Sequence, residues 1–410
     1  MTPGARLAAA AEILTEVAAL KAAADRTISG WGKAHRFAGS KDRAAIAERV
    51  YTVLRRRNEC AFVLGSDTPR ALVLGSLVVA DALDADRIDA LCTDGTHALG
   101  ALTPQERGAL AAPRTPPHDQ PWIRLNYPAW LHDEFAAAFG ANLDTELAAL
   151  NARAPLDLRV NTLKAERDAV LAELEREGLA PLPCAHAPLG LRLAAGSDTK
   201  ITMLAAYREG RIEIQDEASQ LSVLLADAKP GDTVVDLAAG AGGKSLALAG
   251  AMANRGRVLA CDIEPVRMLK MEPRMDRAGA TIIQIVGDPY GEAIKLEVGE
   301  GADIVFVDAP CSGTGTWRRN PEAKWTLDET RLKTFRAAQT QLLDRAAELV
   351  KPGGRIVYVV CSVLPSESTA QVERFAARHP GWRLSKSARF TPAHDGTDGF
   401  FAAILTRSPP

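Results

Sequence analysis

The chain has 410 residues, of which 47% are hydrophobic and 24% are charged, and its formal net charge is −2 at pH 7. These values are typical of a globular protein with two or three domains, and they exclude a polycation. No run reaches the ~20 apolar residues of a membrane helix, and the alanine-rich start carries Glu12 and Glu16 in place of a signal-peptide pattern. We therefore expect a monomeric cytoplasmic protein without a membrane segment.

Residues 5–105 have the apolar spacing of helices. Within 42–58, four apolar residues recur at helical intervals and leave the basic side chains outside: Ile46, Val50, Val53 and Leu54. From Trp31 to Cys60 there are eight Lys or Arg against three Asp or Glu, a bias that most often marks a solvated helix face. Four prolines between residues 113 and 121 mark a linker.

A second helical stretch, 128–153, precedes a change of pattern. Residues 156–160 alternate like a strand, 167–177 have helical spacing, and 189–193 alternate again. This pattern predicts a small α+β unit of about 60 residues between the helices and the rest of the chain.

From Lys229 onward, short β-branched runs alternate with helical segments. This alternation predicts a parallel sheet with right-handed crossovers, the α/β class of fold. The expected strands are 233–237, 257–263, 281–286, 302–308 and 355–360, with a final strand at 400–406. Ligands bind beyond the carboxyl ends of strands in such sheets, and the polar motifs of this chain cluster there.

A glycine-rich loop, Ala238-Ala-Gly-Ala-Gly-Gly-Lys-Ser245, follows the first of these strands. A phosphate-binding P-loop would need Gly at 238, and a dinucleotide fingerprint would need Gly at 245. A third interpretation, an S-adenosylmethionine loop, needs only close backbone approach. Acidic residues at the next two strand ends favour it. The candidate cofactor-binding residues are Ala238, Ala239, Gly240, Gly242, Gly243, Lys244, Asp262, Arg267, Asp288 and Asp308.

Two cysteines follow the two hydrophobic runs that end near Asp308 and Val360. If these strands are neighbours, about 4.8 Å apart, Cys311 and Cys361 reach one small substrate. Two thiols and a carboxylic acid beside a methyl donor suit carbon methylation through a covalent adduct. The remaining cysteines are expected to be small buried apolar residues, and without a CxxC or a spaced His pair we predict no metal site: Cys60, Cys92, Cys184 and Cys261.

These motifs resemble a known family. Asp308-Ala-Pro-Cys-Ser-Gly-Thr-Gly-Thr-Trp-Arg-Arg-Asn-Pro-Glu-Ala-Lys-Trp325 and Val360-Cys-Ser-Val-Leu-Pro-Ser-Glu367 are similar to the two cysteine motifs of RNA 5-methylcytosine methyltransferases, of the bacterial RsmB (Fmu/Sun) type. Further likeness lies in 158–164, 215–221 and 397–401. The resemblance implies a Rossmann-like methyltransferase domain at 221–410, an RRM-like α+β unit at 144–220 and a helical NusB-like RNA-binding domain at 1–143.

The resemblance also implies roles for single residues. Chemistry alone leaves the choice of nucleophile open, because the thiol of a Pro-Cys motif attacks in DNA cytosine methyltransferases. In the RNA family the later thiol attacks, which implies Cys361 as nucleophile, with Cys311 assisting release and Asp308 in the active site. The implied cofactor is S-adenosylmethionine and the implied partner is RNA, most of all small-subunit ribosomal RNA. Transfer RNA, or a non-catalytic RNA-binding role, stays open.

Basic residues are candidates for contacts with RNA phosphates. In the RRM-like unit, residues 158–164 contain no aromatic stacking pair, so phosphate contacts are expected there instead of base stacking. Three further cations directly follow the Cys311 loop and are expected to clamp the polyanion. The candidate RNA-binding residues are Arg153, Arg159, Lys164, Arg318, Arg319 and Lys324.

Overall fold

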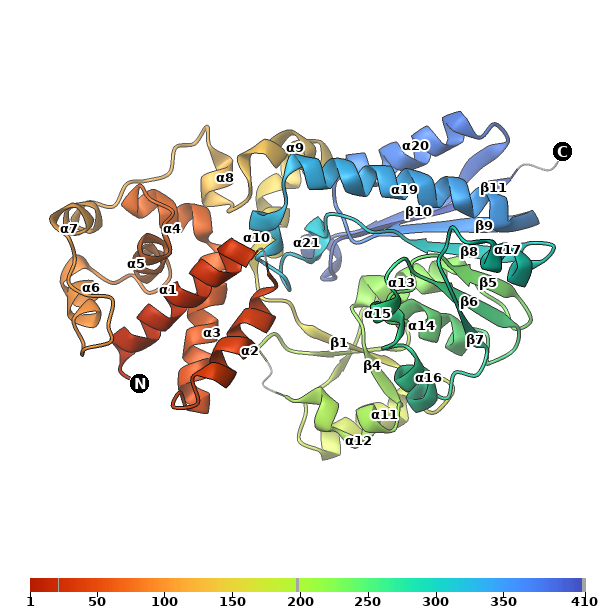
Figure 1. Cartoon of the computed structure of the whole chain (residues 1–410), viewed down its shortest axis with the longest axis horizontal. Coiled ribbons are helices and arrows are strands. Elements are labelled where there is room, and N and C mark those ends of the chain that lie inside the picture. Colours follow the sequence, from red (N-terminus) through yellow and green to blue (C-terminus); the bar gives the residue numbers. More distant parts are fainter. Residues whose placement is uncertain (21, 197–198, 408–410) are drawn as a thin grey trace. The chain divides into compact units, whose positions relative to one another are not determined.

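The computed structural model describes residues 1–20, 22–196 and 199–407. The chain forms two compact units, drawn in sequence colours in Figure 1. The helical unit is Met1–Ala152 together with Thr316–Asp328, and the α/β unit is Arg153–Gly315 with Glu329–Pro410. The α+β and Rossmann-like segments therefore share one unit, and a short piece after Cys311 groups with the N-terminal helices. The finer division into 1–143, 144–220 and 221–410 stays a prediction.

The helical unit packs around the buried helix α5, in which every residue from 71 to 77 is buried. A Cβ at Gly75 would lie 2.2 Å from the carbonyl oxygen of Cys60, so glycine lets α4 and α5 pack closely. The helices are α1 (Pro3–Leu20), α2 (Ala24–Ala34), α3 (Ser40–Arg55), α4 (Arg57–Leu64), α5 (Pro69–Val79), α6 (Ala85–Cys92), α7 (Pro104–Ala111), α8 (Pro121–Arg124), α9 (His132–Phe139), α10 (Leu143–Asn151) and α18 (Ala323–Thr326), with 3-10 turns at Ala129–Leu131 and Gly140–Asn142.

Within the described ranges, no single helix is long and apolar enough to cross a membrane. The pair α4 and α5 passes the test of length and composition only when joined, and the two helices are bent by 100° at their junction.

The α/β unit begins with a small antiparallel sheet in the order β2-β3-β1-β4. Leu158 and Val160 alternate into its core with Leu191 and Ile212, which is why the sequence alternates there. The elements are β1 (Leu156–Val160), α11 (Arg167–Arg176), β2 (Leu182–Pro183), β3 (Gly190–Leu193), α12 (Ala205–Arg208) and β4 (Ile212–Ile214), with a 3-10 turn at Ile201–Met203.

The larger sheet has seven strands in the order β10-β11-β9-β8-β5-β6-β7. The strands from β9 to β7 are parallel, and β11 and β10 are antiparallel to their neighbours. The strands are β5 (Thr233–Asp236), β6 (Arg257–Cys261), β7 (Ile283–Gly287), β8 (Ala302–Asp308), β9 (Val350–Val360), β10 (Trp382–Phe390) and β11 (Phe400–Arg407). This sheet confirms the predicted Rossmann-like α/β class.

Helices cover both faces of this sheet (Figure 1). Alternate strand residues pack on two separate cores: Val234 and Phe306 face α13, α14 and α16, whereas Val235 and Val307 face α17, α19 and α20. Burial on both faces explains the continuous apolar runs. The helices are α13 (Glu217–Ala226), α14 (Gly243–Ala251), α15 (Pro265–Met268), α16 (Glu272–Ala278), α17 (Glu292–Val298), α19 (Glu329–Leu349), α20 (Thr369–Arg378) and α21 (Pro392–Asp395), with 3-10 turns at Thr314–Thr316 and Pro365–Glu367.

The sequence did not predict strand β10. It forms the edge of the sheet, where it pairs with β11 alone, and residues 383–387 are exposed. Its sequence, Trp-Arg-Leu-Ser-Lys-Ser-Ala-Arg-Phe, therefore has no apolar run to mark it as a strand. Charged edge strands of this kind resist pairing with other chains.

Candidate active site

The two cysteines lie side by side beyond the carboxyl ends of β8 and β9. These strands are parallel neighbours, with Asp308 opposite Val359. The Sγ atoms of Cys311 and Cys361 are 3.3 Å apart, within hydrogen-bonding distance for sulfur, and both side chains are partly exposed. The two sulfur atoms are therefore as close as the prediction of neighbouring strands requires, and contact of both with one substrate stays a prediction.

The side chain of Glu367 is hydrogen-bonded to both cysteine loops. This fully buried carboxylate accepts hydrogen bonds from the backbone N–H of Ser312 at 2.9 Å and from the hydroxyls of Ser312 and Ser362. Ser312 directly follows Cys311, and Ser362 directly follows Cys361. The amide of Gln339 donates a further bond to the same carboxylate at 3.0 Å. One side chain therefore fixes the position of both thiol-bearing loops.

Lys244 and Asp308 form an ion pair beside the thiols. Nζ of Lys244 lies 2.6 Å from Oδ2 of Asp308 and 5.6 Å from the centre of the Phe400 ring. Burial acts to lower the pKa of Lys244, but the Asp308 carboxylate outweighs it and the net pKa is raised, so the ammonium stays charged. The hydrogen bond to Cys361, together with burial, raises the pKa of the Cys311 thiol, so Cys311 holds its proton.

The glycine-rich loop lies between β5 and α14, as predicted. Gly240 and Gly242 have φ angles of +56° and +83°, which side chains rarely adopt. A Cβ at Gly242 would lie 2.5 Å from Cγ of Met271, so space and backbone angle both require glycine there. The N-terminus of α14, which begins at Gly243, points its free backbone N–H groups toward this loop.

A cavity of about 560 Å³ lies beyond the ends of β6 and β7. Asp262 and Asp288 line it together with apolar side chains that include Ile263 and Leu269. Asp262 also accepts hydrogen bonds from the N–H groups of Gly240 and Glu264, both at 2.8 Å, and lies 3.5 Å from Arg267. The acid therefore connects the glycine loop to the wall of the cavity.

These features suit an adenosine-bearing cofactor. The cavity has the size of an ordinary ligand pocket, with apolar side chains for a flat purine and two carboxylates for hydroxyl or amino groups. A loop at a helix N-terminus can take the carboxylate of an amino acid. The residues present thus fit S-adenosylmethionine, the cofactor that the resemblance implies.

Asp236, at the end of β5, was missed in the sequence. It is fully buried, accepts a hydrogen bond from Ser245 at 2.6 Å, and has no partner for Oδ1 within the described residues. Burial raises its pKa to about 7. A carboxylate at the strand end directly before a glycine loop was the available signal. Glu367 was also missed, although it stands within the second cysteine motif.

Three of the six predicted RNA-binding residues are buried, so their side chains are not accessible to a phosphate in this structure, and RNA contacts there stay predictions. Arg159 is 4% exposed and donates to Gln215 at 2.6 Å. Lys324 is fully buried in the helical unit, where Nζ donates to the Arg55 carbonyl and the Asn151 side chain. Burial lowers the pKa of Lys324 to about 7. Arg318 is 5% exposed.

The other three predicted RNA-binding residues have at least partly accessible side chains. Arg153 and Lys164 are exposed, and Arg319 is half-buried. Nζ of Lys164 donates a hydrogen bond to the carbonyl of Glu209 at 3.0 Å. Contacts of these three residues with RNA stay predictions. The sequence could not distinguish these accessible cations from the buried ones, because both groups lie in polar stretches of the chain.

The four remaining cysteines are buried, as predicted, and burial raises the pKa of Cys60, Cys184 and Cys261 to about 12 and that of Cys92 to about 11.

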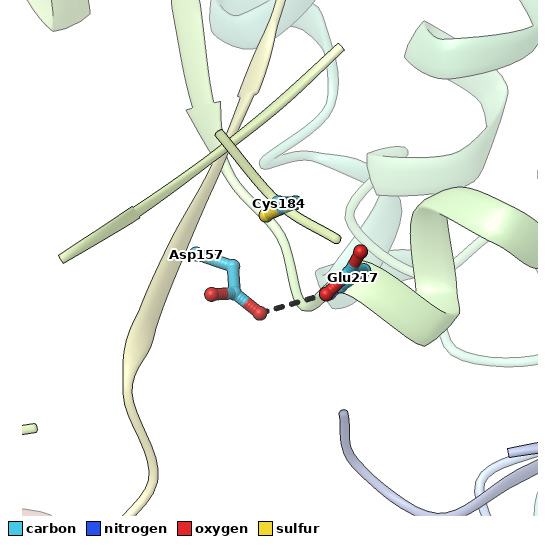
Figure 2. A group of neighbouring side chains, drawn as sticks. All are labelled: Asp157, Cys184 and Glu217. Atoms are coloured by element: carbon cyan, nitrogen blue, oxygen red, sulfur yellow. Dashed lines mark hydrogen bonds between the residues drawn. The ribbon is translucent and has the colours of Figure 1, made fainter. Parts of the chain in front are cut away.

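One of these cysteines, Cys184, lies beside Asp157 and Glu217 in a cluster with the spacing of metal ligands (Figure 2). Arg192 donates to Asp157 at 2.6 and 2.8 Å and to Glu217 at 3.1 Å. Backbone N–H groups also donate hydrogen bonds to these two carboxylates. One of these bonds runs from the N–H of Glu217 to the carboxylate of Asp157 and is the dashed line in Figure 2. Both carboxylates thus already have hydrogen-bond donors, and the cluster links β1 to α13.

Comparison with known proteins agrees with this geometry. Residues 223–406 match the family model of the 16S rRNA methyltransferase RsmB/F, and residues 127–200 match the ferredoxin-like domain of RsmF/B-like methyltransferases. The chain is 30% identical over 402 residues to ribosomal RNA small subunit methyltransferase B of Erwinia tasmaniensis, covering 91% of this chain and 92% of that one.

Two further proteins are similar. The probable ribosomal RNA small subunit methyltransferase B of Synechocystis is 34% identical over 303 residues, which cover 70% of this chain and 68% of that protein. The crystal structure of PH0851 superposes with a TM-score of 0.78 at 26% identity and covers 99% of both chains. With the paired cysteines, the glycine loop and both matched domains in one chain, the protein belongs to the RsmB/F family of methyltransferases.

Proposed function

We propose that this chain methylates C5 of a cytosine in RNA through a covalent adduct with Cys361. The observation that carries the proposal is the 3.3 Å separation of the Cys311 and Cys361 sulfur atoms beside the Lys244–Asp308 pair. S-adenosylmethionine supplies an electrophilic methyl group when bound. C5 of cytosine is a poor nucleophile, so the chain must activate the base.

Activation begins with the Cys361 thiolate, which adds to C6 and turns the ring into an enamine whose C5 can attack a methyl group. The family resemblance assigns this role to Cys361, and Cys311, whose thiol pKa is raised by its hydrogen bond to Cys361 and by burial, is left as a proton donor. The negative charge that addition places on the base is neutralised by a proton at N3. The proton on Nζ of Lys244 passes to N3 through Oδ2 of Asp308, to which Nζ donates at 2.6 Å, and it returns by the same route when the base is released.

Release of the methylated base reverses the addition of Cys361. After methyl transfer the C5 proton leaves to water, the C5–C6 double bond forms again, and the C6–S bond breaks. The departing Cys361 sulfur then takes a proton from Cys311, whose S–H lies within hydrogen-bonding distance. The base has to be unstacked from RNA to reach both sulfurs.

Small-subunit ribosomal RNA is the substrate that we infer, because the family model and the two relatives carry that substrate in their names. Transfer RNA is the alternative with the same chemistry. A non-catalytic RNA-binding role would not need both thiols and the ion pair at the ends of adjacent strands.

The test is the transfer of methyl label from the cofactor to purified small-subunit ribosomal RNA and to transfer RNA, followed by nucleoside analysis. We expect 5-methylcytidine in ribosomal RNA. Label in transfer RNA alone would replace the substrate, label at another atom would overturn the cytosine-C5 mechanism, and no label with either RNA or with small-subunit particles would support the non-catalytic role.

A further inference from the structure

The helical unit contains a cavity of about 770 Å³ that the proposed methylation does not use. Its walls come from the first turns of α1, the end of α2 and the segment after α6. The side chains with chemistry to offer are Glu12, Trp31, His35, Phe37 and His97. Three of these five are aromatic side chains from residues 31–37, so this part of the wall is largely apolar.

Two of the rings are held rigidly. The indole of Trp31 donates a hydrogen bond from Nε1 to Glu12 at 3.0 Å. The His35 ring stacks on it with a centroid separation of 4.2 Å and an interplanar angle of 17°. Nδ1 of His35 lies 2.9 Å from the Trp31 carbonyl oxygen. This wall is therefore formed before any ligand binds.

Phe37 lines the cavity and is also exposed to solvent. Its ring lies edge-on to His35, at 5.7 Å and 89°, and the residue is 72% exposed. An exposed phenyl ring gains nothing from burial in the folded chain, whereas a flat ligand stacked on it would remove apolar surface from water.

The chain segment that carries the three rings is rich in basic residues, whereas Glu12 is the acid among the lining residues. Between Arg26 and Arg43 the chain has five basic residues and a single acid, Asp42. Asp42 is neutralised by the Met1 amine at 3.2 Å and by Arg6 at 2.8 Å. All five basic residues are exposed: Arg26, Lys33, Arg36, Lys41 and Arg43. A ligand with a flat ring and flanking negative charges complements such a surface.

We propose that this cavity, which we term the Phe37 pocket, binds an unstacked nucleobase of single-stranded RNA. The base stacks on the exposed aromatic ring while flanking phosphates lie against the basic rim, the combination that single-stranded nucleic acid sites use. The proposal rests on RNA being the substrate. It assigns to the helical unit the base stacking for which the strands of the RRM-like unit have no aromatic residue.

The test compares Phe37→Ala with Phe37→Trp in the full chain, by fluorescence anisotropy with a labelled single-stranded RNA over a range of salt concentrations. Loss of one stacked base costs about tenfold or more in affinity. We expect that loss for Phe37→Ala, near wild-type affinity for Phe37→Trp, and the same salt slope for both, because no charge changes. Arg36→Ala should instead reduce the slope by about 0.7.

Several outcomes would overturn the nucleobase site. They are an unchanged affinity of Phe37→Ala for RNA, a Phe37→Trp variant as weak as Phe37→Ala, or a melting temperature that falls equally in both variants. A loss of affinity for small-subunit particles but not for naked RNA would assign the Phe37 pocket to a protein partner instead. Because binding is measured without methyl transfer, a chain that binds RNA through Phe37 yet transfers no methyl group would contradict only the proposed function.

Discussion

Glu367 binds Ser312 twice, through the backbone N–H and through the hydroxyl, although the two residues are 55 positions apart. The same carboxylate accepts a bond from Ser362 at 2.6 Å. The carbonyl of Glu367 in turn accepts a bond from the hydroxyl of Tyr358 on β9 at 2.6 Å. The residues that follow the two cysteines thus share one buried acceptor, which holds the sulfur atoms at their short separation.

Replacing Glu367 with Gln should lower kcat by about a hundredfold, because a catalytic group displaced by ~1 Å loses about that much. The Gln side chain has nearly the same volume as Glu. It has one acceptor oxygen where Glu has two, although four donors point at this group. The KM for the cofactor should stay unchanged, since the cavity at Asp262 and Asp288 is formed by other strands.

A second measurement, which reports the position of the thiols and not folding, is the rate at which a thiol-oxidising reagent such as diamide joins Cys311 to Cys361 in a disulfide. We expect this rate to fall in Glu367→Gln. Glu373→Gln, an exposed change on the following helix, serves as the control. Wild-type kcat and oxidation rate in Glu367→Gln would show that the carboxylate does not position the thiols.

The two cysteines should fail in different ways. Cys361→Ala removes the nucleophile and should abolish methyl transfer without forming an adduct. Cys311→Ala leaves the nucleophile but removes the proton donor for release, so an RNA–protein adduct should accumulate and survive denaturation. Mass spectrometry of the digested adduct locates the bond. Attachment at Cys311 in the wild-type chain would reverse the two roles.

Much of this site followed from the sequence because it lies at strand ends. Continuous apolar runs marked β8 and β9, and once these were parallel neighbours, Cys311 and Cys361 had to meet. The burial of Lys324 could not be foreseen, since its partners Arg55 and Asn151 are 269 and 173 positions away. In the sequence, Lys324 follows the Cys311 loop closely. In the folded chain, its amine is buried in the core of the helical unit.

Asp236 should make the stability of the cofactor-free chain depend on pH. Its pKa is about 7 in the folded state, because of burial, against an ordinary value of 3.8. The unfolded chain thus releases this proton at lower pH, so the contribution of Asp236 is complete below about pH 4 and is lost as pH rises to about 7. The difference amounts to about 4 kcal/mol.

Asp236→Asn cannot ionise and should escape that loss. We expect its melting temperature to rise relative to the wild type between pH 4 and pH 7, and then to run parallel. Asp276→Asn removes an exposed carboxylate on α16 and is the matched control. A difference between Asp236→Asn and wild type that is constant from pH 4 to pH 8 would contradict the raised pKa.

The buried and exposed lysines should separate in their effect on RNA binding. Each phosphate contact to a single strand contributes about 0.7 to the slope of log affinity against log salt. Lys164→Met removes an exposed cation and should reduce the slope by about that amount. Lys324→Met removes an amine that is fully buried in the helical unit, so it should leave the slope unchanged and alter the melting temperature instead.

Cofactor affinity, measured over the same salt range, is the control and should stay nearly constant in all three chains. A reduced slope in Lys324→Met would mean that this amine reaches phosphate after all, through an opening of the core that the melting temperature would also register.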